Sequence, residues 1–190
     1  MVPRWIQHTF GMVALGAILF WGWDVSQAYS NGTLFLPNPK GPASLGKLVP
    51  RIRAKQQDGT PNYLRQFRGK WVLVNFWATW CAPCRHEMGS LERLAKTLKS
   101  PNFALWAVSI DANWDVIQKF FKTHPTLKQG NLTMKVALDA SGESARRYGT
   151  SKFPETYLID PEGRLRQKWI GPFQWDKPAM VQQIKTLMTR

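Results

Sequence analysis

A chain of 190 residues, 44% of them hydrophobic, is long enough for one domain with a sizeable core plus an additional segment. Its 26 Lys and Arg against 12 Asp and Glu give a formal charge of +14 at pH 7, which favours a partner of opposite charge such as anionic lipid, an acidic protein or nucleic acid. The basic residues are spread along the chain without a basic arm or a nucleic-acid-binding motif, so we expect no nucleic acid partner and favour an anionic membrane face.

The first 28 residues have the pattern of an export signal or a membrane anchor. Arg4 precedes an uncharged run of 14 residues, Phe10–Trp23. A signal-peptide core spans about 7–15 apolar residues and a membrane-spanning helix needs about 20, so the run alone favours a signal, and its flanking residues extend it to a marginal span. Cleavage after Ala28 would suit the small residues before it, whereas Trp21 and Trp23 are typical of interfacial anchors.

Both outcomes deliver the following domain outside the cytoplasm. Arg4 is followed by no Lys or Arg until Lys40, which fits a cytoplasmic N-terminus under the positive-inside rule. We therefore expect a single-pass inner-membrane protein whose domain faces the periplasm or another extracytoplasmic space, or a secreted protein. A buried core helix is the remaining alternative, although the run is not amphipathic. Residues 29–48 are rich in Gly and Pro and predict an extended linker to a domain at residues 49–190.

The predicted domain begins with short elements and then a central strand. Weakly alternating residues 49–55 and the turn signal at residues 57–60 indicate a strand and a hairpin-like excursion, and residues 63–67 a short helical turn. The continuously apolar run Trp71–Ala78 is typical of a strand buried on both faces of a mostly parallel sheet.

Helices and strands then alternate. Pro83 fits an early position of a helix that extends to about Lys99, and residues 103–110 predict the next buried strand. A second helix at residues 113–122 and a short strand at residues 134–138 follow, and this order predicts parallel pairing through right-handed crossovers.

The C-terminal part predicts a hairpin and a closing helix. After a short helix near residues 142–148, strands at 156–160 and 165–170 flank the turn signal Pro-Glu-Gly-Arg, which makes them antiparallel. Residues 177–188 predict the last helix. The fold class is therefore α/β, a mixed central sheet flanked by helices in three layers.

The two cysteines, Cys81 and Cys84, lie between the central strand and the following helix. Two thiols separated by two residues at a helix start are close enough to form a disulfide. Helix N–H groups and the helix dipole would stabilise the thiolate of Cys81, which would attack a partner disulfide, and the more enclosed Cys84 would resolve the mixed disulfide. Dithiol exchange of this kind needs no cofactor besides the disulfide.

Other interpretations of the pair remain open. A purely structural disulfide would contribute little, because its loop is short. A zinc site would need a second Cys/His pair, whereas only His86 adjoins the cysteines and His8 and His124 lie elsewhere, so we predict no metal site. A disulfide oxidase or isomerase, or a copper chaperone that binds Cu(I) through the same thiolates, would use the same residues. No threonine-containing peroxidatic motif surrounds either cysteine.

Residues 74–87, Val-Asn-Phe-Trp-Ala-Thr-Trp-Cys-Ala-Pro-Cys-Arg-His-Glu, resemble the active-site segment of the thioredoxin superfamily, and more narrowly of its membrane-tethered TlpA/ResA/CcmG (DsbE) group. The resemblance extends over about residues 49–188. It implies a thioredoxin-like fold and the reduction of disulfides in exported proteins, among them the haem-attachment cysteines of apocytochrome c. Such a reductase needs protein disulfide substrates and a membrane electron donor, because that compartment is oxidising.

The resemblance also implies a catalytic role for Pro154, as a cis-proline that lies against the cysteines and presents the preceding backbone to a partner strand. An ordinary turn proline is the alternative. Asn75 departs from thioredoxin, which carries a buried acid at that strand position.

Glu87 lies three residues after Cys84, on the same helix face, and matches the acid that the tethered reductases carry near their cysteines. It would exchange a proton with the resolving cysteine; a solvated helix charge is the alternative. We expect four further residues to contact the substrate: Trp80, Pro83, Phe153 and Glu155.

Overall fold

The structure, a computed structural model, describes residues 39, 41–124, 126–127 and 129–189. The predicted signal or anchor at residues 1–28 lies outside the described residues, as does the first part of the predicted linker. Within the described part, no helix is both long enough and apolar enough to cross a membrane.

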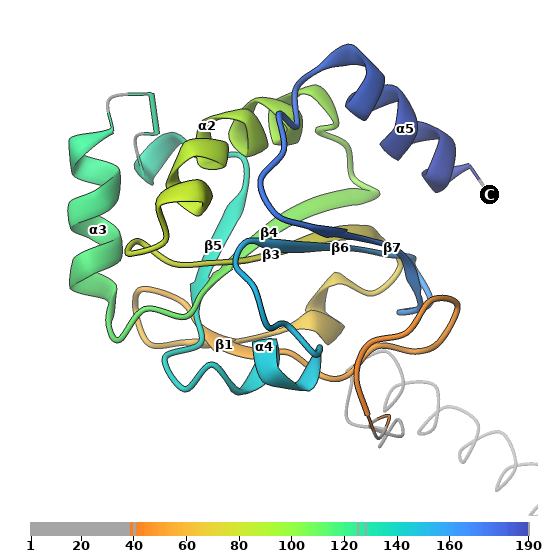
Figure 1. The fold of residues 1–190 in the computed structure, drawn as a ribbon, viewed down its shortest axis with the longest axis horizontal. Helices are drawn as coiled ribbons and strands as arrows, with labels where there is room; N and C mark the ends of the chain where they lie inside the picture. The colour runs from red at the N-terminus through yellow and green to blue at the C-terminus, as the bar shows by residue number, and fades with distance from the viewer. Residues whose placement is uncertain (1–38, 40, 125, 128, 190) are drawn as a thin grey trace, which may run out of the picture. The chain divides into compact units, whose positions relative to one another are not determined.

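A seven-stranded mixed sheet forms the centre of the domain, with the strand order β2-β1-β5-β4-β3-β6-β7 (Figure 1). Strands β3, β4 and β5 are parallel, whereas the pairs β1–β2 and β6–β7 are antiparallel hairpins. The predicted mixed sheet is confirmed. The strands are β1 (Arg53–Lys55), β2 (Pro61–Tyr63), β3 (Trp71–Trp77), β4 (Phe103–Ser109), β5 (Lys135–Leu138), β6 (Glu155–Ile159) and β7 (Leu165–Ile170).

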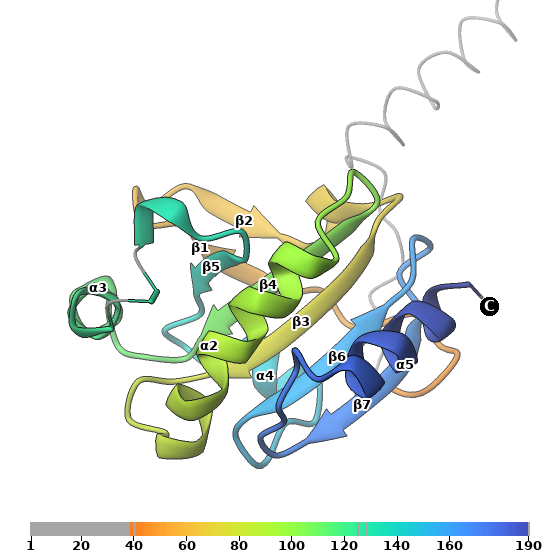
Figure 2. The ribbon, with the colours of Figure 1, turned by 90° about the horizontal axis from the view of Figure 1, so that it is seen from above.

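Helices cover both faces of this sheet and complete the predicted three layers (Figures 1 and 2). One hydrophobic core contains residues of α2, α3 and α5, and the other contains residues of η1 and α4. The bounds are η1 (Leu64–Phe67), α2 (Ala82–Thr97), α3 (Trp114–Thr123), η2 (Gln129–Asn131), α4 (Glu143–Arg147) and α5 (Pro178–Met188).

Strand β3 contributes side chains to both cores. Leu73 and Trp77 pack in the core beneath α2, and Val74 and Phe76 pack in the core beside α4. Successive side chains of a strand point to opposite faces, so a strand covered on both sides is apolar at nearly every position, and in β3 only Asn75 is not. This explains the continuous run in the sequence, and it places the C-terminal end of β3, where the cysteines follow, in the middle of the fold.

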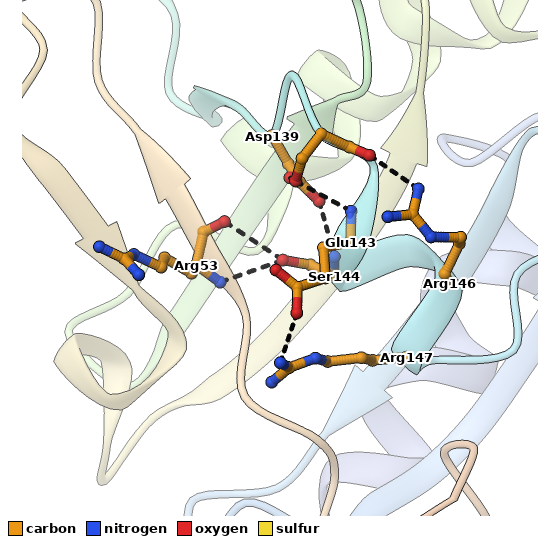
Figure 3. A network of polar contacts seen from close by, with 7 residues as sticks. Arg53, Asp139, Glu143, Ser144, Arg146 and Arg147 are labelled. Carbon is orange, nitrogen blue, oxygen red and sulfur yellow. Dashed lines mark hydrogen bonds and ion pairs between the residues drawn. The ribbon is translucent and has the colours of Figure 1, made fainter.

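Polar contacts attach α4 to the first strand (Figure 3). The Ser144 hydroxyl donates to the carbonyl oxygen of Arg53 at 3.2 Å and accepts from its N–H at 3.1 Å. Asp139 accepts the N–H of Ser144 at 2.8 Å, and Glu143 pairs with Arg147 along the helix. The network joins β1 to α4.

Residues 45–48, within the predicted linker, pair with the start of β7. The Gly46 N–H donates to the carbonyl oxygen of Leu165 at 2.7 Å, and the Leu165 N–H donates to that of Lys47 at 2.9 Å. Before them, Pro42 packs against the turn after α4: a Cβ atom on Gly149, whose φ is +74°, would lie 2.9 Å from the Pro42 Cβ. The described chain is thus attached to the domain from Pro42 onward.

Candidate active site

Cys81 and Cys84 form a disulfide at the N-terminus of α2. Cys81 is the N-cap residue, and its Sγ accepts the N–H of Cys84 at 3.2 Å. Pro83 is exposed in the first turn, where its missing N–H costs no helical bond. Cys81 is 7% exposed, whereas Cys84 has no exposed surface. Of the two sulfurs, only that of Cys81 is therefore accessible to a partner thiolate.

The turn that carries the pair is held by a buried acid from the neighbouring strand. Asp111, two residues after the end of β4, accepts the Thr79 N–H at 3.0 Å, the Thr79 hydroxyl at 2.8 Å and the Ser109 hydroxyl at 2.6 Å. Because β3 and β4 are parallel, their C-terminal ends meet at one sheet edge, and Asp111 reaches the residues just before Cys81. Asp111 was not among the predicted site residues, although an acid directly after the predicted strand 103–110 is a usable signal.

Glu87 lies one turn after Cys84 and is 1% exposed. Its Oε1 accepts the Asn75 side-chain amide at 2.8 Å, and its Oε2 accepts the Phe173 N–H at 3.0 Å and the Trp175 indole N–H at 2.8 Å. Burial raises the pKa of Glu87 to about 7, against the opposing effect of these three donors. The alternative of a solvated helix charge is wrong: Glu87 is an internal group that changes protonation state near neutral pH.

Asn75 links the central strand to this carboxylate. Its amide also donates to the Thr156 hydroxyl of β6 at 2.9 Å, while its Oδ1 has no hydrogen-bond partner among the described residues. The buried acid that thioredoxin carries at this strand position is absent, and the carboxylate of Glu87 reaches Asn75 from the helix instead. Trp175 and Phe173 come from the connection between β7 and α5, which no residue pattern in the sequence had marked.

The Phe153–Pro154 peptide bond is cis, as the family resemblance implied. The carbonyl oxygen of Pro154 accepts the Gly171 N–H at 2.9 Å. Trp80 is 64% exposed and meets Phe153 edge to face, with ring centroids 6.0 Å apart. The cysteine turn and the cis-proline turn therefore lie side by side, with two aromatic rings between them.

Glu155 is directed away from this surface. Its side chain is buried, its Oε2 accepts the Tyr157 hydroxyl at 2.6 Å and it forms a 2.9 Å ion pair with Lys168. Tyr157 belongs to the core beside α4, on the face of the sheet opposite α2. The structure thus gives the Glu155 carboxylate internal partners in place of the predicted contact with substrate.

Residues 45–168 match the model of the AhpC/TSA family. The chain belongs to this family. Within the described residues of this AhpC/TSA protein, no group of three or more His, Cys, Asp or Glu side chains is arranged to hold a metal ion.

Three relatives indicate the chemistry of the pair. Thioredoxin-like protein YneN of Bacillus subtilis is 29% identical over 174 residues, 90% of this chain and 92% of YneN. Thiol-disulfide oxidoreductase ResA of Bacillus thuringiensis subsp. konkukian is 34% identical over 127 residues, 67% of this chain and 70% of ResA. The crystal structure of a candidate thiol:disulfide interchange protein DsbE from Chlorobium tepidum has a TM-score of 0.67 at 29% identity and covers 76% of this chain and 98% of that chain.

These relatives confirm the thioredoxin-like fold. Together with the Cys81–Cys84 disulfide at the helix N-terminus, they identify this AhpC/TSA protein as a thiol–disulfide oxidoreductase.

Proposed function

We propose that this protein is a reductase that converts disulfides of exported proteins into pairs of thiols. One observation carries the proposal: the resolving cysteine is fully buried one turn from an enclosed carboxyl group whose pKa is raised to about 7, and only the attacking cysteine keeps some exposed surface, 7%. A resolving thiol attacks only as its thiolate, so a buried proton acceptor beside it serves the release of a client.

The proposed exchange proceeds in two steps. The Cys81 thiolate attacks one sulfur of the client disulfide, that S–S bond breaks, and the other client sulfur leaves as a thiolate. Cys84 then gives its proton to the Glu87 carboxylate, and the resulting thiolate attacks the Cys81 sulfur. The client disulfide has gained two electrons in total, one for each sulfur, and its two thiolates take up protons from Glu87 and solvent, while Cys81 and Cys84 have lost these two electrons and form the disulfide.

Trp80, Pro83, Phe153 and Pro154 form the proposed docking surface for the client. Three of these side chains, Trp80, Pro83 and Phe153, are exposed or partly exposed, and the rings of Trp80 and Phe153 meet edge to face. Glu155 would act on this surface indirectly, through its bonds to Tyr157 and Lys168 below the cis-proline turn.

The proposed site of action is outside the cytoplasm, with residues 1–28 as an inner-membrane anchor or a cleaved signal. A dithiol donor protein of the membrane would reduce the Cys81–Cys84 disulfide again and become oxidised itself. The haem-attachment cysteines of apocytochrome c are a fitting client, since they form a closely spaced thiol pair that an oxidising compartment converts to a disulfide.

The reduction potential of the pair tests the direction of exchange. The full chain is equilibrated with glutathione buffers, and the oxidised fraction is measured by alkylation of free thiols. We expect a potential below about −200 mV, whereas a value near about −120 mV would identify an oxidase and overturn the proposal. Cys84→Ser serves as the control, because it can form the mixed disulfide through Cys81 but cannot resolve it.

A further inference from the structure

The connection between β7 and α5, residues 171–176, runs past α2 (Figure 1) and is bonded to both parts of the site. Its Gly171 N–H holds the carbonyl oxygen of Pro154, and its Phe173 N–H and Trp175 indole hold Glu87. Ser90 of α2 donates to the Phe173 carbonyl oxygen at 3.3 Å and accepts the Trp175 N–H at 3.2 Å. We call residues 171–176 the clamp segment.

Trp175 is the buried centre of the clamp segment. It has no exposed surface and packs edge to face on Trp169 at 5.5 Å between centroids and, at a tilt, on Phe173 at 5.6 Å. Two other fully buried indoles, Trp77 and Trp106, have no hydrogen-bond partner among the described residues, so in this fold packing alone suffices to bury the ring. We therefore expect the bond from Trp175 to Glu87 to stabilise the carboxylate rather than the packing of the ring.

We propose that Trp175 is a positioning residue for thiol–disulfide exchange, whose indole N–H keeps the Glu87 carboxylate ionised and fixed beside Cys84. The inference rests on the proposed role of Glu87 and adds a residue to it. The side-chain hydrogen bond of Trp175 goes to Glu87, and the proposed role acts through this acid.

The electrostatic argument follows from the surroundings of the carboxylate. Burial favours the protonated acid, and a hydrogen bond donated to a carboxylate favours the ionised form. Of the three donors that oppose burial, the Trp175 N–H lowers the pKa of Glu87 most.

Other titratable or charged groups lie on the packed elements, and several of them have partners of their own. On α2, Arg93 pairs with Asp176 of the clamp segment at 2.6 Å, and Glu92 accepts the N–H groups of Thr133 and Met134. On β6 and β7, Glu155 pairs with Lys168 and accepts the Tyr157 hydroxyl. The remaining groups on these elements are Cys84, Arg85, His86, Lys96 and Arg166.

Trp175→Phe tests the inference, because it keeps an aromatic ring and removes the donor. Reduced protein is mixed with Ellman's disulfide reagent: attack by Cys81 releases one coloured thiolate, and attack by Cys84 on the mixed disulfide releases the second. Loss of a hydrogen bond to a charged group raises the pKa of that group by about one to two units. We therefore expect the plot of the rate of the second release against pH to have its inflection about one to two pH units higher. At pH 7 the second release should slow about fivefold to fiftyfold and recover as the pH rises.

Trp169→Phe is the matched control, since it makes the same change in the same cluster without a bond to Glu87, and its inflection should stay in place. Glu87→Gln should abolish the inflection, and adding Trp175→Phe to it should have no further effect on the second release. A folded Trp175→Phe protein with an unmoved inflection overturns the inference.

A second measurement needs no substitution at Trp175. In the wild-type protein, the NMR signal of the Trp175 indole N–H should titrate with an inflection near pH 7, and that of Trp169 should stay flat. A flat Trp175 signal also overturns the inference. These readouts are independent of the reduction potential, so an oxidase-like potential would refute the reductase proposal and leave the role of Trp175 standing.

Discussion

At the scale of single residues, the site depends on where carboxylates are buried. The side-chain oxygens of Glu87 accept hydrogen bonds from three donors, which stabilise the ionised carboxylate. Burial has the opposite effect and stabilises the protonated acid. Its pKa rises from 4.5 to about 7 on folding, so between these values the folded state binds more protons than the unfolded state. The contribution of Glu87 to stability is therefore full below about pH 4.5 and is lost as the pH rises through about 7.

Glu87→Gln should remove this dependence on pH. Gln cannot ionise, and the unpartnered Oδ1 of Asn75 can accept its amide after a flip of the Asn75 side chain. Relative to the variant, the wild-type free energy of unfolding should fall by about 3 kcal/mol from pH 4.5 to above 7. Urea unfolding of the oxidised proteins at a series of pH values measures the difference, and parallel curves would contradict the burial argument.

At the scale of elements, the cysteine turn is stabilised from outside its own helix. Asp111 connects the end of β4 to Thr79 and thereby fixes the residues between β3 and Cys81. Every group that approaches the Asp111 carboxylate in these bonds is a donor.

Asp111→Asn should destabilise the domain by about 1–3 kcal/mol, because an amide NH₂ cannot accept the bonds of a buried turn. The exposed Asp115 in the first turn of α3 gives the matched control, and Asp115→Asn should change stability by less than about 1 kcal/mol. Unfolding midpoints of the two variants measure this; equal midpoints would remove Asp111 from the support of the turn.

Elements with a strong local pattern could be predicted from the sequence, and long-range pairings could not. The run of β3 and the apolar spacing of α2 follow from burial on known faces, so both elements were predicted to within three residues at either end. The antiparallel pairing of β1 with β5 joins segments about eighty residues apart and has no local signature. The clamp segment escaped prediction for the same reason, since Trp175 is recognisable only through its contact with Glu87.

At the scale of the whole molecule, the fold separates the two signs of charge. Among the residues that the structure describes, six acidic residues are buried, where they accept internal hydrogen bonds or form ion pairs. They are Glu87, Glu92, Asp111, Asp139, Glu155 and Asp160. The exposed surface of the described domain is therefore more basic than the composition alone indicates, and Arg85 and Lys152 lie exposed beside the cysteine and cis-proline turns.

This charge should select among client disulfides. Two disulfide peptides of matched length, one acidic and one basic, are compared as oxidants of the reduced protein. At about 0.01 M salt we expect the acidic peptide to react about tenfold faster, and at about 1 M salt the ratio should approach one, because screening then shortens the range of the field to about 3 Å. A salt-independent ratio would indicate that contacts, rather than the surface field, discriminate.

In the proposed anchored form, the attachment of the chain to the domain from Pro42 onward limits how far the domain can lie from the membrane. Pro42 packs against the turn at Gly149 and residues 45–48 are bonded to the start of β7, so thirteen residues, 29–41, separate the proposed anchor from the domain. Fully extended, they measure about 45 Å. Disulfides farther from the bilayer than this length plus the domain itself would stay out of range, and the enzyme would act on proteins as they emerge at the membrane surface rather than throughout the compartment.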